Sequence, residues 1–172
     1  MPRIAFALVV LCMLQGIAQA LPEDLARDHP NLQLAGQGQL LWFGLHVYDA
    51  RLWAEGGKFD ATAHFALDIR YARDISSARL VRSSLEEMKR LGWNDARRLA
   101  LWRDAMAGLF PDVRKGETLT GVYLPAQGAR FYHQGRLIGM IDDAEFAKAF
   151  FAIWLDPRTR EPGLRSSLIG RP

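Results

Sequence analysis

The stretch His133-Gln-Gly-Arg-Leu-Ile-Gly-Met-Ile-Asp-Asp-Ala-Glu-Phe-Ala-Lys-Ala-Phe-Phe-Ala-Ile-Trp-Leu155 predicts the fold most clearly. Gln134-Gly135 separates two β-like runs, residues 129–133 and 136–141, and glycine at the second turn position supplies the positive φ of a type I′ turn. The hydrophobic period then changes from two to 3.6. We therefore expect a β-hairpin followed at once by a helix over residues 142–155.

The expected helix has start signals and a wide apolar face. Asp142 is the predicted N-cap, and Glu145 three residues later completes a variant of the capping box. A helix that is apolar on most sides is buried in a core. We therefore predict that Phe150 and Trp154, one turn apart on this face, are core residues rather than ligand contacts.

The remaining periodic segments alternate between strands and helices. A helix over 95–109 would be capped by Asn94, and Gly92 would end the helix before it. Because strands, helices, antiparallel strands and helices follow one another, the predicted class is α+β. The expected strands are 32–41, 42–54, 64–71 and 118–124, and the other expected helices are 76–91 and 163–169.

Residues 1–20 have the pattern of a secretory signal peptide. Arg3 gives a positive start, residues 4–14 are a short apolar run, and Ala18-Gln-Ala20 reads as a cleavage site. The apolar run is shorter than the roughly 20 residues of a membrane span. We expect an exported chain, periplasmic or secreted, that begins at Leu21 and has no transmembrane span after cleavage.

Composition limits the classes of function. The formal net charge is +3, and basic and acidic residues are interspersed, so no patch of the density typical of nucleic-acid binding is present. Cys12, the single cysteine, would leave with the signal. Residues 21–172 are expected to form one domain around one core, without a disulfide or a thiol nucleophile.

No local motif marks a catalytic or metal site. The histidines form no H-x-H or H-E-x-x-H pattern, and no G-x-S-x-G elbow occurs. Gly36-Gln-Gly38 lacks the third glycine and the following helix of a dinucleotide fingerprint. Asp142-Asp143 is better explained by helix capping than by paired acid–base carboxylates. We expect no cofactor, no metal and no catalytic residue.

A set of short motifs in fixed order resembles a known family. They are Gly36-x-Gly38, Phe43-Gly-x-x-Val47-Tyr48-Asp-Ala-x-Leu52, Tyr71-x-Arg73-x-Ile75 and Gly135-x-x-x-Gly139-x-Ile141. With the following helix and the signal peptide, they resemble the exported bacterial branch of the chalcone isomerase-like family. The resemblance implies an open-faced β-sandwich, in which a layer of helices covers one face of an antiparallel sheet, with a ligand cleft between them.

The resemblance also implies where a ligand would be held. The family contains a plant enzyme that cyclises chalcones and plant relatives that bind fatty acids, and both use an arginine shortly after the Gly-x-Gly element. The matching residue here is Leu40, whereas the next family site falls on Tyr48. The enzyme's tyrosine and asparagine on the helix after the third strand have no counterpart in residues 76–91.

We therefore expect a non-catalytic protein whose partner is a small apolar or fatty-acid-like ligand. Tyr48 is the first candidate contact. Arg73 is the second, unless it forms an ion pair with Asp74 or lies in solvent at the strand end. Two alternatives remain open, an isomerase or intramolecular lyase with relocated catalytic groups, and an envelope protein-interaction module whose protein partner the sequence does not identify.

Overall fold

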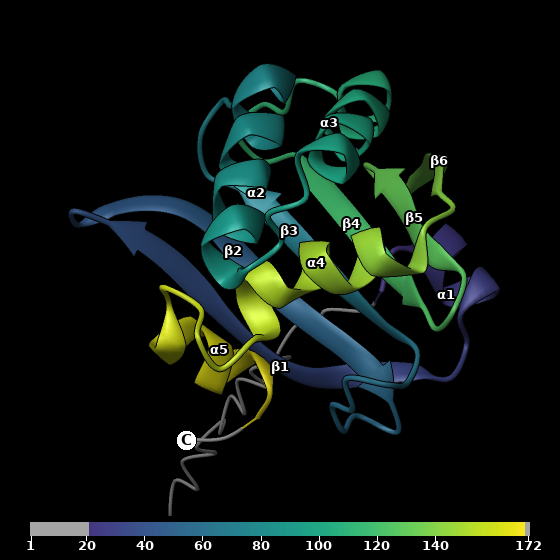
Figure 1. The fold of residues 1–172 in the computed structure, drawn as a ribbon. Helices are drawn as coiled ribbons and strands as arrows, with labels where there is room; N and C mark the ends of the chain where they lie inside the picture. Colours follow the sequence, from purple (N-terminus) through teal and green to yellow (C-terminus); the bar gives the residue numbers. More distant parts are fainter. Residues whose placement is uncertain (1–20, 171–172) are drawn as a thin grey trace, which may run out of the picture.

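The computed structural model describes residues 21–170, so the predicted signal segment lies outside the described part of the chain. Within these residues, six strands form one antiparallel sheet, and each strand pairs with its neighbour in the chain (Figure 1). The strands are β1 (Leu32–Trp42), β2 (Leu45–Glu55), β3 (Phe65–Tyr71), β4 (Thr118–Leu124), β5 (Gly128–His133) and β6 (Arg136–Ile141).

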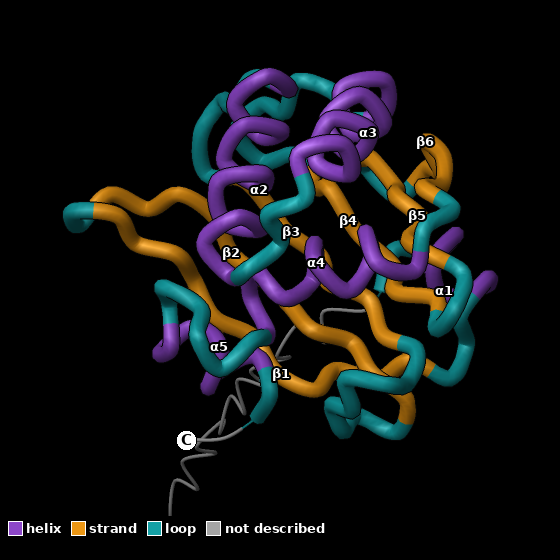
Figure 2. The backbone as a smooth tube through the Cα atoms, in the orientation of Figure 1, coloured by secondary structure: helices purple, strands orange, loops and turns teal. Residues whose placement is uncertain are grey.

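A layer of helices covers one face of this sheet and confirms the predicted open-faced α+β sandwich (Figures 1 and 2). The layer consists of α2 (Ser77–Leu91), α3 (Ala96–Leu109), α4 (Ala144–Leu155) and the short α5 (Pro162–Leu168), which packs on β1. A further helix, α1 (Glu23–Asp28), was not predicted. It packs on the opposite face, where Leu25 is fully buried against residues of the sheet.

The main core lies between the sheet and α4. Phe131 of β5 is in ring contact with both Phe146 and Phe150 of α4, with centroids 6.3 and 5.2 Å apart. Gly121 of β4 leaves room for the Phe151 ring, because a Cβ at this position would lie 3.1 Å from it. The predicted apolar helix is therefore buried, as its composition requires.

The opposite face carries a second, smaller cluster and a buried carboxylate. Asp68 of β3 is fully buried. Arg51 forms an ion pair with it, and the Thr120 hydroxyl donates a hydrogen bond to it at 2.7 Å. A buried charge is tolerated when its oxygens are paired in this way. This face therefore combines a small apolar cluster, to which α1 contributes, with a buried ion pair.

The N-caps of two helices lie one residue after the predicted positions, and the first of these helices is α4. The turn at Gln134 and Gly135 is confirmed, with φ of 51° and 79°. However, Asp143 and not Asp142 caps α4, because its carboxylate accepts hydrogen bonds from the backbone N–H groups of Glu145 and Phe146. Glu145 therefore lies too early to complete a capping box, and its carboxylate pairs with Lys148.

The second error of this kind concerns α3, for which Asn94 was the predicted cap. Asp95 caps this helix instead, and its carboxylate accepts from the backbone N–H of Arg98 at 2.8 Å. Gly92 ends α2 in the left-handed region with φ of 113°, as expected.

Gly36 has a packing role that its motif did not reveal. A Cβ on Gly36 would lie 2.1 Å from the backbone oxygen of Ser167 at the end of α5. Only glycine permits such a close approach of two backbones. This contact allows α5 to lie directly on β1 and to close one side of the helix layer.

Candidate ligand-binding cavity

A cavity of about 710 Å³ lies between the sheet and the helix layer. Its walls come from strands β1 to β5, from α2, α4 and α5, and from the loop before α5. The volume is within the range of small-molecule sites, about 300–1,000 Å³, and lies where the fold leaves two layers apart.

Most of the cavity wall is apolar. Leu67 and Ile69 of β3 form part of the sheet side, while Phe150 and Ile153 of α4 face them from the helix side. Their placement follows from strand alternation, which directs every second side chain of β3 toward the helices. Such a wall favours a ligand whose larger part is apolar.

Tyr48 of β2 provides a polar group in this wall. Its hydroxyl accepts a hydrogen bond from the indole N–H of Trp154 at 2.8 Å. Since the hydroxyl oxygen accepts from Trp154, its own proton remains available for an acceptor in the cavity. The structure thus places Tyr48, the first candidate from the sequence, in the cavity wall.

Tyr71 of β3 lies beside Tyr48, and both phenols are held in the neutral form. The two residues are cross-strand partners, and their rings pack edge to face with centroids 6.1 Å apart. Burial raises the pKa of Tyr48. Burial also raises the pKa of Tyr71, and the neighbouring Tyr48 adds to this effect. Both hydroxyls therefore act as hydrogen-bond donors at neutral pH, and neither is a phenolate base.

Leu40 of β1 is the direct cross-strand partner of Tyr48 and also lines the cavity. The family resemblance implied an arginine at this position, which lies beside the cavity but carries the apolar Leu40 in this chain. No cation is paired with Tyr48 across the strands. The hydroxyl is consequently the polar group that these two positions offer to a ligand.

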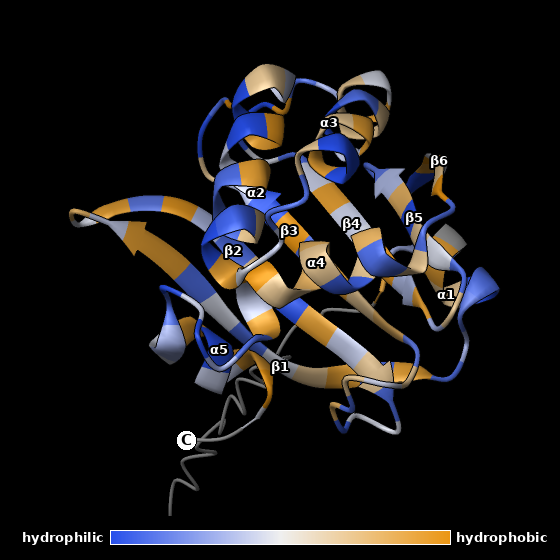
Figure 3. Ribbon diagram, in the orientation of Figure 1, coloured by the Kyte–Doolittle hydropathy of each residue, from blue (hydrophilic) through white to orange (hydrophobic). Residues whose placement is uncertain are grey.

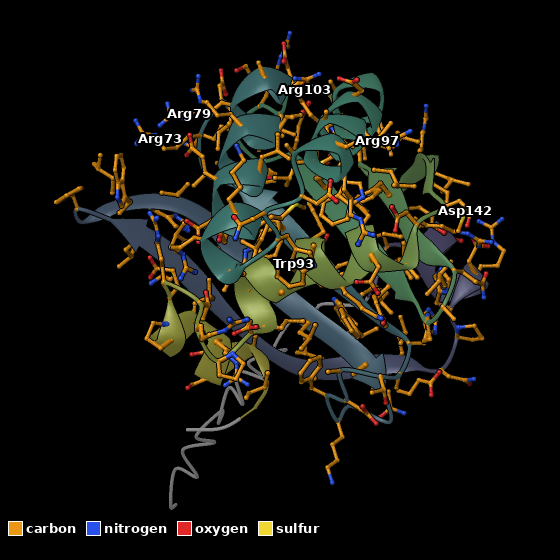
Figure 4. All side chains as sticks on the ribbon, viewed as in Figure 1. Arg73, Arg79, Trp93, Arg97, Arg103 and Asp142 are labelled. Carbon is orange, nitrogen blue, oxygen red and sulfur yellow. The ribbon has the colours of Figure 1, made fainter. Side chains whose placement is uncertain are left out.

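Arg73, the second candidate, lies at the mouth of the cavity and not in its interior. Figure 4 shows Arg73 and Arg79 reaching outward beside α2. Among the described residues, Arg73 forms no ion pair with Asp74, whose carboxylate accepts from the backbone N–H of Lys115 at 2.8 Å. Both arginines are exposed to solvent, so they are available to a charged group at the entrance.

Two expectations for α4 require correction. Phe150 is buried as predicted, but it forms part of the cavity wall. Trp154 is only partly buried, lines the cavity and holds the Tyr48 hydroxyl. The apolar spacing predicted correctly that this face of the helix turns inward. It could not show that the layers separate here, because periodicity is the same beside a core and beside a cavity.

The polar side of the cavity along α2 was missed at the sequence level. Ser83 and Ser84 line it, and Arg79, which is exposed as the hydrophobic pattern predicted, lies at its rim. The only signal was the position of Ser83 and Ser84 one helical turn after the buried Leu80. The hydroxyl of Ser84 donates to the backbone oxygen of Leu80, which makes the signal hard to distinguish from ordinary surface serine.

The histidines do not contribute to this cavity. His29 and His64 meet on the opposite face of the sheet, with ring centroids 4.7 Å apart. Across residues 21–170, no group of three or more histidine, cysteine, aspartate or glutamate side chains is placed to hold a metal ion. In the same part of the chain, no helix has the length and apolar character of a membrane span.

The fold and its cavity define a class of protein, an open-faced sheet-and-helix sandwich with an internal cavity whose wall is mainly apolar. Comparison with known proteins identifies the family. A family model described as chalcone isomerase-like matches residues 15–170, so the chain belongs to the chalcone isomerase-like family.

Two similar proteins extend this result. A Haemophilus influenzae protein, described only as uncharacterized, is 27% identical over 140 residues, covering 81% of this chain and 68% of its own. The crystal structure of the Arabidopsis thaliana fatty-acid binding protein AtFAP1 has the same fold, with a TM-score of 0.63 and 12% identity. That match covers 81% of this chain and 87% of AtFAP1, and at this identity it establishes the fold alone.

Proposed function

We propose that this protein binds a small apolar or fatty-acid-like molecule without transforming it. The cavity of about 710 Å³ with a mainly apolar wall is the observation that carries the proposal. The fatty-acid binding of the structural neighbour AtFAP1 is consistent with it. The apolar part of the ligand would lie between β3 and α4, where Leu67, Ile69 and Phe150 line the cavity.

The polar contact inside the cavity would be the Tyr48 hydroxyl. It is oriented by Trp154 and keeps its proton because burial raises its pKa. A carboxyl, carbonyl or hydroxyl oxygen of the ligand is the acceptor that this donor fits. Arg73 and Arg79 at the mouth would add a weaker, solvent-screened attraction for an anionic group.

The same groups support a non-catalytic role. Cyclisation of a chalcone requires stabilisation of negative charge as it develops on oxygen. The position across from Tyr48 carries Leu40, and both tyrosines in the wall are neutral. An uncompensated anion in this part of the cavity would be strongly disfavoured, which opposes an oxyanion intermediate. For the same reason, a fatty acid that contacts Tyr48 would bind there as the neutral carboxyl group and not as the carboxylate.

Fluorescence titration with cis-parinaric acid, a fatty-acid probe, tests the proposal. Wild type should bind, and Tyr48→Phe should weaken binding by about 3- to 10-fold, the value of one hydrogen bond of about 0.5–1.5 kcal/mol. Arg73→Ala should have a smaller effect because the side chain is exposed. Arg70→Ala, on the exposed opposite side of β3, is the matched control and should leave binding unchanged.

Two results would contradict the proposal. Absence of probe binding by folded wild-type protein would remove the ligand-binding role. Chalcone ring closure, followed by absorbance, at a rate well above the spontaneous one would show that catalytic groups have moved elsewhere in the cavity. Loss of binding in Arg73→Ala with little change in Tyr48→Phe would place the polar group of the ligand at the mouth.

We also propose that the protein acts outside the cytoplasm, as a periplasmic or secreted protein. The charged start, the apolar run and Ala18-Gln-Ala20 support export with cleavage after Ala20. N-terminal sequencing of the protein recovered from the cell envelope fraction should begin at Leu21. An intact Met1, or an acylated Cys12, would contradict the proposal.

A further inference from the structure

The β1–β2 hairpin extends beyond the helix layer and ends in an apolar tip. The tip consists of Leu41, Trp42, Phe43 and Leu45, whose exposed fractions are 50%, 55%, 89% and 52%. Figure 1 shows the hairpin projecting from one side of the body. Figure 3 shows hydrophobic residues on the projecting part of the hairpin. A gathering of large apolar side chains on a projection is typical of an interaction site.

Phe43, at the centre of the tip, has a backbone conformation that is unfavourable for phenylalanine. Phe43 and Gly44 form the turn with φ of 48° and 75°, as in a type I′ turn, whose first position prefers asparagine, aspartate or glycine. A phenylalanine there is strained. Its ring is exposed, and the ring contact it makes within residues 21–170 is with Trp42, at a centroid distance of 5.2 Å. Strain of this kind occurs at functional sites.

Basic side chains flank the tip on the side of the cavity mouth. Arg73 and Arg79 line the same cavity mouth as Trp42 and Leu45 and reach outward in Figure 4. Lys115 is attached to this end of the sheet through its backbone hydrogen bond to Asp74. In the described part of the chain, no side-chain hydrogen bond or ion pair is found for Arg73, Arg79 or Lys115, and all three are exposed. Arg114 is also exposed, and its charge helps to lower the pKa of the neighbouring Glu117.

The nearby carboxylates, in contrast, are engaged with backbone groups. Asp74 accepts from the N–H of Lys115, Asp112 from the N–H of Ser77, and Glu117 from the N–H of Arg114. These hydrogen bonds fix the acidic groups close to the body, whereas the longer arginine and lysine side chains extend into solvent. Exposed acidic groups also occur near the tip, namely Asp49, which pairs with His46, and Glu86 and Glu161 of the cavity lining. The exposed positive charges are therefore confined to the side of the tip that carries Arg73, Arg79, Arg114 and Lys115.

We propose that the hairpin tip docks on an anionic phospholipid bilayer, with Phe43 and Trp42 entering the interface and Arg73, Arg79, Arg114 and Lys115 contacting the headgroups. Aromatic residues favour the membrane interface, and basic residues are attracted to anionic lipids. A second copy of the chain fits the tip less well, because the same basic residues would face one another. Docking would bring the cavity mouth to the lipid surface, but it does not depend on what the cavity binds.

Flotation with lipid vesicles tests the proposal on the full protein as it is purified from the cells that express it. Wild type should float with vesicles of phosphatidylethanolamine and phosphatidylglycerol and bind weakly to phosphatidylcholine alone. Phe43→Asn should weaken binding by about tenfold or more, since one aromatic side chain no longer enters the bilayer. The double variant Arg114→Ser, Lys115→Ser should lose the preference for phosphatidylglycerol.

Leu101→Gln is the control, because Leu101 is a similarly exposed apolar residue, 64% accessible, on α3. It should float like wild type. Equal flotation of Phe43→Asn and wild type, or no flotation of wild type, would overturn the proposal. A dimer that Phe43→Asn disrupts would overturn it in favour of self-association. Because Phe43→Asn should retain cis-parinaric acid binding, failure of docking and failure of the proposed ligand binding are separate results.

Discussion

Replacing Asp143 by alanine is expected to destabilise the protein more than any neighbouring surface change, because one carboxylate serves two structural roles. It caps α4 by accepting from the N–H groups of Glu145 and Phe146 at 2.8 and 3.0 Å. Its second oxygen accepts from the indole N–H of Trp102 of α3 at 2.8 Å. Asp143 therefore joins the start of α4 to α3.

The magnitude follows from the two groups that lose their acceptor. Removing an aspartate N-cap costs about 1 kcal/mol. The Trp102 side chain is 2% exposed, and an unsatisfied buried donor costs about 1–3 kcal/mol. We expect a total of about 2–4 kcal/mol, which corresponds to roughly 4–16 °C in Tm for a chain of this size.

Thermal unfolding and urea titration of Asp143→Ala, with Asp142→Ala as the matched control, measure this effect. Asp142 is the adjacent residue, is also an aspartate and is exposed, and a change at such a site stays within about 0.5 kcal/mol. Equal losses in both variants would refute the assignment of the cap to Asp143. A loss below about 0.5 kcal/mol in Asp143→Ala would show that the carboxylate does not join the helices.

The acid dependence of Asp143 provides a second measurement on the same residue. Burial by itself would raise the pKa of this carboxyl, but the hydrogen bonds from Trp102, Phe146 and Glu145 outweigh burial and lower it. A carboxyl with a lowered pKa stabilises the fold above its unfolded pKa of about 3.9 and loses this contribution as pH falls through the folded value. Asp143→Asn should flatten this acid-induced loss of stability.

Three further predictions concern other parts of the fold. Phe43→Asn should raise the unfolding free energy by up to about 1 kcal/mol, because it relieves the strained turn and exposes no buried surface. Gly36→Ala should lower it by about 2 kcal/mol or more and expose α5 to proteolysis, since the new methyl group meets the Ser167 backbone. The pKa values of His29 and His64 are lowered, mainly by burial, so stability should fall as pH decreases below about 6.5. His64→Gln should reduce that slope in thermal unfolding series.

The elements with strong local signals were predictable from the sequence. Strand β4 was expected at its observed bounds, and the turn at Gln134 and Gly135 followed from the chemistry of type I′ turns. The helix caps were each placed one residue too early, at Asn94 and Asp142. Adjacent capping residues look equivalent in a sequence, and tertiary contacts such as the Trp102 hydrogen bond decide between them.

The candidate site was predictable only where the family resemblance identified a position. Tyr48 is in the cavity wall and Leu40 is its cross-strand partner. Trp154 was assigned to the core, because the periodicity of α4 does not reveal that the layers separate near its end. Arg79 is exposed, as predicted, but the hydrophobic pattern did not show that its side chain also lies at the rim of a cavity.

The cavity mouth and the apolar tip have one structural origin, the unequal length of the strands. Strands β1 and β2 have 11 residues each, while β3 and β4 have seven. Since β2 pairs with β3 from Tyr48 to Ala54, residues 45–47 of β2 lie beyond β3 at the tip end, which is roughly 10 Å at about 3.3 Å per residue. The helices cover the shorter strands, so the inner side chains of the extension, Trp42 and Leu45, face the cavity entrance instead of a core. Shortening the hairpin would remove both the entrance wall and the tip, so it could not distinguish ligand entry from surface docking. A substitution at Phe43 can distinguish them, because the Phe43 side chain belongs to the tip and does not line the cavity.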